Sequence, residues 1–441
     1  MGTDVLVGGS AGERLVPHPL RAAILGEVHA RPFTPIETPR RVVHFAFDTS
    51  GERAQADRAA LTGFCAQRGL EPLNPADKQH RVVFGGTALR WEQHSEFTTY
   101  TWELSCATPA PDAAPFNPPA SALAAPMASV PQPGPLLVAL DLHLLAEADG
   151  ANAPERIFDR NSLAVAENSD GLALFATDFH TDAAGYVRIL VINRGLGAER
   201  AGALIQRIVE IETYRTLALL GLPEAQRLSP AISRIERRLA EITEEMRRAA
   251  ALVDNHRLLD ELMALAAELE AGAAASLFRF GASRAYNEIV QLRLPTIGER
   301  KVDGFPTWSS FLARRMAPAM RTCITTQERQ ENLSQKLART ANLLRTRVEV
   351  EVEQQNRVLL TSMNERTRLQ LRLQATVEGL SVAAISYYVV GLCGYLIKAA
   401  YDARILRVDP SYATAAVVPL TVLAVWWVVR RIRRRHIRAT E

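Results

Sequence analysis

Two uncharged apolar segments lie near the end of the chain, separated by a short polar loop. They are Gly379–Ile397 and Ser411–Val429, and each has 19 residues. As α-helices they would be roughly 28 Å long, which is close to the hydrocarbon thickness of a bilayer. The pattern therefore predicts a transmembrane hairpin over residues 379–429. The alternative is a pair of helices buried in a soluble core.

Two tryptophans lie near the end of the second segment and basic side chains follow it, as they do where a membrane helix reaches the headgroups. The predicted membrane-surface anchors are Trp426, Trp427, Arg430, Arg431, Arg433, Arg434 and Arg435. The tail over residues 430–441 carries six arginines and one glutamate, whereas the loop between the segments has only a small positive excess. The positive-inside rule then places both chain termini in the cytoplasm. We expect a bacterial inner-membrane protein whose tail meets anionic lipid.

Residues 1–195 contain short runs rich in β-branched and aromatic residues, a pattern typical of strands. Eight such runs are Arg41–Phe47, Arg81–Thr87, Leu89–His94, Phe97–Leu104, Leu136–Leu144, Ser162–Glu167, Leu172–Thr177 and Tyr186–Asn193. Runs separated by only a few residues predict antiparallel hairpins. Alanine and proline dominate residues 108–135, which we interpret as a flexible insertion. We expect a cytoplasmic α/β domain with a largely antiparallel sheet.

Residues 196–378 change to the pattern of long helices, and we expect a coiled-coil stalk. Ser229-Pro230 is typical of a helix start, with a capping serine and a proline in the first turn. A seam with steps of three and four residues follows, made by Ile232, Ile235, Leu239, Ile242, Met246, Ala249 and Val253. A second helix is expected over Ala273–Leu292, and a loop over Pro295–Pro306.

A third helix is predicted from about Trp308 into the first apolar segment without a break. Its apolar seam is Leu333, Leu337, Leu344, Val348, Val352, Leu359 and Met363. The seam repeats every 3.75 residues or so, about a quarter of a residue above the period of a left-handed two-helix zipper. A stalk helix that continues into the membrane would couple the cytoplasmic part to the bilayer.

Charge and cysteines narrow the class of protein. The formal net charge of +3 is accounted for by the basic tail, so we expect no nucleic-acid partner. The four cysteines lie far apart and form no CxxC pair, which is typical of reduced thiols in the cytoplasm.

The plan of an α/β domain, a long helix, two spans and a basic tail resembles that of the CorA-type divalent-cation transporters. The similarity is strongest over residues 370–441, where Val389–Tyr395 reads VVGLCGY. That family has a Gly-Met-Asn triplet here, whose asparagine contacts hydrated magnesium. In this chain Tyr395 and Leu396 follow Gly394, so magnesium selectivity is not carried over. The resemblance implies a homo-oligomer, with a pentamer as the candidate assembly, and a divalent cation as the candidate cargo.

The chain also resembles a bacterial family of membrane-anchored proteins of unknown function. The matching stretches are HARPF at His29–Phe33, QRIVEIETYRTLALLGLP at Gln206–Pro223 and EGLSVAAISYYVVGL at Glu378–Leu392. This resemblance implies a shared architecture over nearly the full length, without an activity.

The first apolar segment is unusually polar for a simple anchor. Ser381, Tyr388, Gly391 and Tyr395 step by seven, three and four residues, which places them on one helix face. This face is the candidate lining of a pore. A dry interface between helices is the alternative, because small and hydroxylated residues also favour close helix packing.

Asp178, His180 and Asp182 stand at alternate positions. On a strand they would share a face and hold a divalent ion as a regulatory sensor. The alternative is that they are ordinary turn residues between two strands. In the loop between the spans, Asp402 and Asp409 could attract cations, but Arg404 and Arg407 between them would weaken that field. The alternative, which we favour, is an ordinary solvated loop.

The sequence contains no Ser-x-Gly nucleophile elbow, no HExxH zinc helix and no GxxxxGK phosphate loop. We therefore expect no catalytic residues, no enzyme activity and no cofactor. The leading hypothesis is a CorA-like membrane oligomer that lets cations through. The alternative is a non-conducting, membrane-anchored scaffold that binds a cytoplasmic protein.

Overall fold

The computed structural model describes residues 17–21, 24–25, 33–74, 77–106, 115–116, 119, 127, 130–147, 154–248, 252–403, 405 and 407–437, with side chains in the last helix up to Arg431. Most of the predicted insertion at 108–135 and most of the HARPF stretch therefore lie outside the described residues. The chain forms two compact units, residues 1–243 with 262–338, and residues 244–261 with 339–441. The predicted α+β class is confirmed.

A nine-stranded sheet forms the centre of the first unit. Its strands are β1 (Arg40–Asp48), β2 (Gln79–Phe84), β3 (Thr87–Gln93), β4 (Phe97–Ser105), β5 (Leu136–Ala146), β6 (Ala164–Asn168), β7 (Ala173–Thr177), β8 (Val187–Asn193) and β9 (Glu299–Lys301). Their order across the sheet is β2-β3-β4-β1-β5-β8-β7-β6-β9, and β5 with β8 is the parallel pair in an otherwise antiparallel sheet. The eight predicted strands are confirmed.

Strand β9 differs from the sequence prediction, which expected a loop over residues 295–306. This stretch also contains the short helix η3 (Leu294–Ile297). Residues Glu299–Lys301 pair with β6 at the sheet edge, opposite Ala166–Asn168. A strand of three residues is too short to show alternation, so its existence depends on the edge that it meets.

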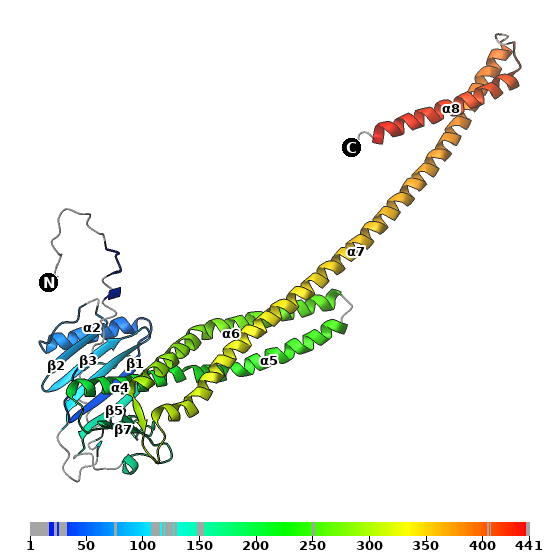
Figure 1. The fold of residues 1–441 in the computed structure, drawn as a ribbon. Coiled ribbons are helices and arrows are strands. Elements are labelled where there is room, and N and C mark those ends of the chain that lie inside the picture. Colours follow the sequence, from blue (N-terminus) through cyan, green and yellow to red (C-terminus); the bar gives the residue numbers. More distant parts are fainter. Residues whose placement is uncertain are drawn as a thin grey trace, which may run out of the picture. The chain divides into compact units, whose positions relative to one another are not determined.

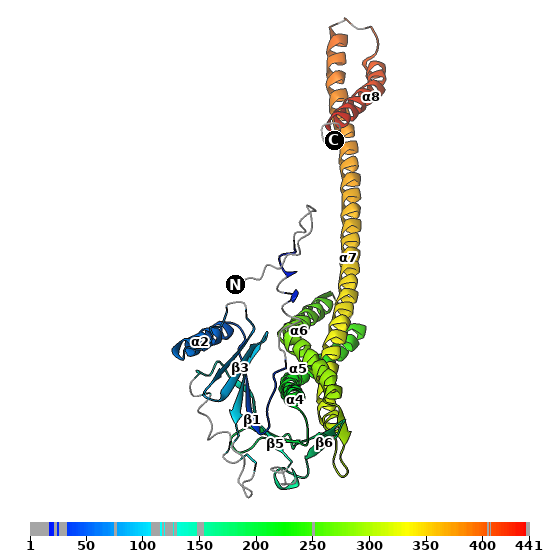
Figure 2. The same ribbon diagram turned by 60° about the vertical axis from the view of Figure 1, so that its left-hand side comes forward.

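Helices cover both faces of the sheet (Figure 1, Figure 2). Helix α2 (Arg53–Gln67) packs on Val43, Phe45 and Phe47 of β1, while α4 (Ala198–Leu219) packs on the alternate residues Val42 and Ala46. Strand alternation thus sends successive side chains to two different helices. The sequence analysis predicted no separate helix at α2, which buries few apolar side chains.

The remaining helices are α5 (Gly221–Arg248), α6 (Leu252–Arg293), α7 (Trp308–Asp402) and α8 (Pro410–Ile437), and a short helix η2 (Pro154–Arg156) precedes β6. The predicted continuity of the third stalk helix with the first span is confirmed by α7, a single helix of 95 residues. Helix α6 begins well before the predicted Ala273.

The predicted helix start at Ser229-Pro230 is wrong, because Pro230 lies inside α5. Leu228 and Ile232 are buried on either side of it, and their packing keeps the helix continuous across the proline. The break comes earlier, at Leu220 between α4 and α5. Gly221, the first residue of α5, packs so closely on α6 that an added Cβ would lie 2.6 Å from the hydroxyl oxygen of Ser283.

Both predicted seams are buried over a shorter length than the sequence analysis expected. Val253, expected at the end of the first seam, lies in α6 and is exposed. In the α7 seam, Leu333, Leu337, Leu344 and Val348 are buried, whereas Val352, Leu359 and Met363 are exposed. Within the second unit, Arg347 of α7 donates to the carbonyl of Met246 at 2.6 Å, so this part of the seam packs on its own chain.

Candidate functional site

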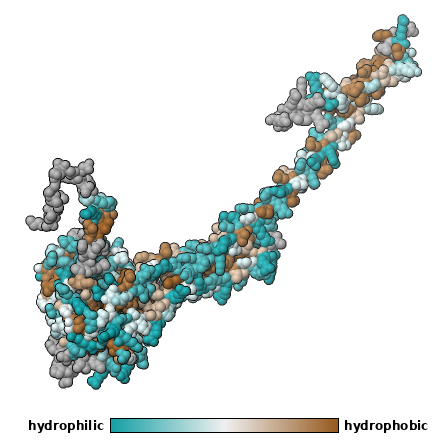
Figure 3. Space-filling view, viewed as in Figure 1, coloured by the Kyte–Doolittle hydropathy of each residue, from teal (hydrophilic) through white to brown (hydrophobic). Residues whose placement is uncertain are grey.

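The end of α7 and the helix α8 are both long and apolar enough to cross a membrane. In each of their most apolar 18-residue windows only 6% of the residues are buried. A core helix of a soluble protein would be mostly buried, so this exposure fits transmembrane segments better. Apolar side chains lie open over the hairpin and along part of α7 in Figure 3.

Small and hydroxylated side chains join the two spans. A Cβ on Gly394 of α7 would meet the methyl carbon of Thr414 in α8 at 3.7 Å, an ordinary van der Waals contact. Ser386 of α7 and Thr421 of α8 are both buried. The hairpin therefore uses close packing of the kind expected between membrane helices.

Asp409 begins α8. Its carboxylate accepts the backbone N–H of Ser411 at 2.8 Å, and Pro410 occupies the first helical position. These are the features of a capped helix start. Asp409 therefore caps a helix in the loop where the sequence analysis considered cation attraction by Asp402 and Asp409.

The four candidate pore residues all lie on the exposed side of the first span. Ser381, Tyr388, Gly391 and Tyr395 are exposed, and they point away from the side of α7 that carries Ser386 and Gly394. The contact between the two spans of one chain thus leaves this face free.

The same face continues toward the N-terminus of α7 as an apolar stripe. Its exposed residues are Val352, Leu359, Met363, Leu373 and Val377. At about 100° per residue, these five and the four candidate pore residues fall within one arc of roughly 80°. We call the nine residues together the open face of α7. Arg366 and Gln370 interrupt it with polar side chains.

The predicted anchors at the end of α8 pair across one helical turn. The guanidinium of Arg430 lies 4.8 Å from the ring centre of Trp426, and that of Arg431 lies 5.0 Å from the ring centre of Trp427. Such pairs present an aromatic and a cationic group at the same level of the helix, as an interfacial belt does. The side chains of Arg433, Arg434 and Arg435 lie outside the described residues.

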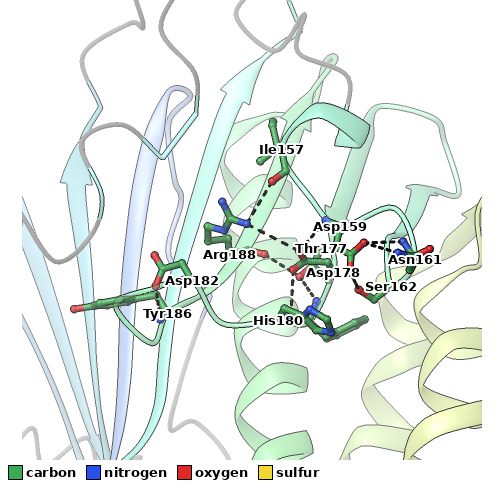
Figure 4. Close-up of polar contacts among 11 residues, drawn as sticks. Ile157, Asp159, Asn161, Ser162, Thr177, Asp178, His180, Asp182, Tyr186 and Arg188 are labelled. Carbon is green, nitrogen blue, oxygen red and sulfur yellow. Dashed lines mark hydrogen bonds and ion pairs between the residues drawn. The ribbon is translucent and has the colours of Figure 1, made fainter.

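The structure does not bring Asp178, His180 and Asp182 together as metal ligands (Figure 4). One carboxylate oxygen of Asp178 accepts the backbone N–H of His180, and the other accepts that of Asp159, both at 3.1 Å. Asp182 accepts the backbone N–H of Tyr186 at 2.9 Å, on the far side of the turn between β7 and β8. Within the described part of the chain, no group of three or more His, Cys, Asp or Glu side chains has a metal-binding arrangement.

Sequence reasoning missed a group of buried polar residues between the sheet and α4. His44 of β1, Arg90 and Glu92 of β3 and Gln206 of α4 line one cavity. The alternation in Leu89–Gln93 (LRWEQ) was the available signal, since it places charged side chains on one face of β3. That pattern alone is typical of a face in water, and α4 covers it here.

A family model matches residues 16–436, and so extends over the sheet, the stalk helices and both spans. The chain belongs to DUF3422. The members of DUF3422 are described as proteins of unknown function, which agrees with the second resemblance in the sequence. No curated protein and no solved structure matches the chain. The CorA-type resemblance therefore rests on the order of elements alone.

Proposed function

We propose that this DUF3422 protein is a homo-oligomer of the bacterial inner membrane in which the α7 helices of several copies surround a path for cations. The observation that carries the proposal is the open face of α7, whose residues stay on one side of the helix from Val352 to Tyr395. A second copy of α7 is the occupant that this face fits, because the face crosses from the stalk into the first span. Only another membrane-anchored helix can follow it over that length.

The energetic argument concerns the stalk part of the face. Exposed Leu359 and Met363 each leave apolar area in water, and burying such area stabilises an assembly by about 25 cal/mol per Å². Exposed apolar residues aligned along one side of a helix are typical of an interaction surface. Arg366 and Gln370 would then fix the register between copies, as polar residues in a helical seam do.

The membrane part of the face gives the cation path its chemistry. Ser381, Tyr388 and Tyr395 offer hydroxyl oxygens, and Gly391, which has no side chain, lets neighbouring helices approach closely. Hydroxyl oxygens can replace part of the hydration shell of a cation. A pentamer on the CorA-like plan is the candidate assembly, and a divalent cation is the candidate cargo. The arginine-rich end of α8 supports a cytoplasmic position for both termini, because basic residues flank membrane helices on that side.

The first test is the mass of the detergent-solubilised full chain, measured by light scattering with the detergent subtracted. We expect a ring-sized assembly of about five copies for the natural chain. The double variant Leu359→Gln with Met363→Gln should lower the mass. The matched control is Leu360→Gln with Leu371→Gln, which changes two exposed apolar residues outside the open face.

A mass of one or two copies for the natural chain would leave no ring to enclose a path, and would contradict the proposal. If both double variants lowered the mass equally, the open face would not be the surface through which the copies assemble.

The second test is manganese entry into liposomes that enclose a quenchable dye. The natural chain should admit manganese, and Tyr388→Ala should raise the rate by widening the constriction. Tyr387→Ala is the control, because this exposed neighbour points about 100° away on the helix. Absence of flux from a correctly assembled oligomer would rule out permeation.

A non-conducting scaffold is the second candidate, and one surface favours it. Helix α6 exposes Met263, Leu277, Phe278 and Leu292 within an arc of roughly 100°. This surface would bind a cytoplasmic protein partner. Under this hypothesis, flux is absent and Phe278→Ser abolishes partner binding without changing the mass of the assembly.

A further inference from the structure

The face of the sheet that meets α4 becomes polar toward β3 and β4. Arg90 and Glu92 of β3 and Thr99 of β4 point to this side, while the alternate residues Leu89 and Trp91 belong to the core beneath α2. Together with α4 and the end of α6 they enclose a cavity of about 180 Å³. This space is large enough for several waters or for a small organic molecule.

Helix α4 supplies the opposite wall. Gln206, Val209, Glu210, Thr213 and Tyr214 line the cavity, and their spacing of three, one, three and one residues places them on one helix face. All five belong to the stretch at Gln206–Pro223 that links the chain to its family. The proposed membrane function makes no use of them.

A chain of alternating charges crosses the cavity. Arg90 lies 3.8 Å from Glu92 and donates to the amide oxygen of Gln206 at 2.8 Å. The amide nitrogen of Gln206 donates to Glu210 at 3.1 Å, and Glu210 pairs with Arg293 at 2.7 Å. The two arginines and the two glutamates balance, so the cavity carries no net charge.

The Arg90–Glu92 pair costs stability, because burying an ion pair loses hydration that the pairing does not fully return. Arg90 is 9% exposed, and its Nε has no hydrogen-bond acceptor among the described residues. The Thr99 hydroxyl is also buried without a hydrogen-bond partner in the described part of the chain. Buried polar atoms normally have partners, so these two atoms beside the cavity are available to hydrogen-bond a molecule that enters it.

Aromatic side chains form another side of the cavity. The ring of His94 stacks on Phe97 with centres 4.1 Å apart, and Tyr214 stands edge-on to Phe97 at 6.2 Å. Phe33 and Val209 also line the space. The cavity therefore has a charged side and an apolar side.

His44 contributes to the wall as a fixed neutral ring. Thr213 donates its hydroxyl hydrogen to the carbonyl of Val209 at 2.8 Å, so it accepts from His44 Nε2–H at 3.0 Å. The other ring nitrogen then accepts from Thr101 at 2.8 Å. Burial lowers the pKa of His44 to about 3, with smaller contributions from Arg90 and His94, so the ring adds no charge.

We propose that this cavity binds a small zwitterion of the amino-acid class, with the carboxylate toward Arg90 and Arg293, the ammonium toward Glu92, and an apolar side chain against Phe97 and Tyr214. A zwitterion matches a cavity that holds both charges in equal number. A ligand with a single charge would give the cavity a net charge, because the two arginines and the two glutamates already balance each other. This site is independent of whether the protein conducts ions.

The test is thermal unfolding of the full chain in detergent with a matched set of ligands. The set is L-leucine, 4-methylpentanoate, which lacks the ammonium, and 3-methylbutylamine, which lacks the carboxylate. The other standard L-amino acids are tested at the same millimolar concentrations. A zwitterion that binds the folded chain should raise the melting temperature with concentration, and the singly charged analogues should not.

Two variants locate the binding. Arg90→Met should weaken binding at least tenfold, and Thr99→Val, which changes the cavity wall with little volume change, should weaken it by a smaller factor. The control Arg329→Met removes an arginine that pairs with Glu236 at 2.7 Å outside the cavity, and it should leave binding unchanged. If Arg90→Met does not fold, Thr99→Val still decides.

Three results would overturn the proposal. They are no shift with any L-amino acid, a shift by 4-methylpentanoate or 3-methylbutylamine equal to that by L-leucine, and unchanged binding by both cavity variants.

Discussion

Helix α4 covers two regions of the same sheet face, and they have opposite character. Over β5, β7 and β8 the contact is dry, with Leu142, Phe175 and Val191 packed into the main core together with residues of α4. Over β3 and β4 the contact holds the charged cavity around Arg90 and Gln206. One helix thus contributes its apolar residues to the first region and its polar residues to the second.

The two regions therefore have different roles: the dry one stabilises the fold, and the polar one forms the cavity of the proposed binding site. Apolar burial in the dry region supplies the stability, at about 25 cal/mol per Å². The polar region lowers this stability, because its buried charges and its polar atoms without hydrogen-bond partners among the described residues are unfavourable in the absence of a ligand. Proteins commonly give up stability in this way at binding sites. Three measurements would test the contrast.

The largest effect is expected in the dry region. Leu142→Ala removes a fully buried side chain of β5 and should lower the free energy of unfolding by about 4 kcal/mol, since the space cannot collapse within a sheet. Urea unfolding of the full chain in detergent, followed by tryptophan fluorescence, measures it. Leu292→Ala is the control, because this side chain is exposed and should change stability by less than about 0.5 kcal/mol. Similar losses for both would refute the assignment of the dry region as the main core.

The next effect concerns pH and the polar region. The pKa of His44 is about 3 in the folded chain and 6.5 in an ordinary environment, so the unfolded chain binds the proton first as the pH falls. Its contribution to stability is complete above pH 6.5 and is lost as the pH falls toward 3.

Between pH 6.5 and 4.5 this loss amounts to about 2.3 kcal/mol. The difference in stability between the natural chain and His44→Gln, measured at both pH values, isolates this group from the carboxyls that titrate nearby. A difference that does not change with pH would show that His44 is not buried as described.

The smallest effect compares two threonines of the cavity wall. Thr213→Val leaves the buried Nε2–H of His44 without its acceptor and should cost about 2 kcal/mol. Thr99→Val removes a hydroxyl without a partner among the described residues, and should change stability by about 0 to 0.5 kcal/mol or increase it slightly. Thermal unfolding of both variants measures the difference. Equal costs would mean that Thr99 has a structural partner.

Much of the fold could be predicted from local patterns. Runs rich in β-branched and aromatic residues located strands β1 to β8, and the length of two apolar segments located the parts of α7 and α8 that fit membrane spans. The helical spacing of Ser381, Tyr388, Gly391 and Tyr395 placed them on one side of the helix, where they lie in the structure. These features depend on residues within a few positions of each other.

Other features required contacts between distant parts of the chain. Strand β9 exists because the end of α6 returns to the sheet edge, and Pro230 is accepted inside α5 because its neighbours are buried. The seam of α7 is continuous in sequence, yet Leu344 is buried and Leu359 is 60% exposed. Periodicity shows which face is apolar, but it does not show how far along the helix a partner covers that face.

The sequence alone therefore determined the elements, the two candidate spans and the polarity of each strand face. The tertiary structure decided what covers each face. The alternation in LRWEQ is the same whether β3 meets water or a helix, because it depends only on strand geometry. Arg90 and Gln206 are 116 residues apart in the chain, and only folding brings them within hydrogen-bond distance and encloses their charges in a cavity.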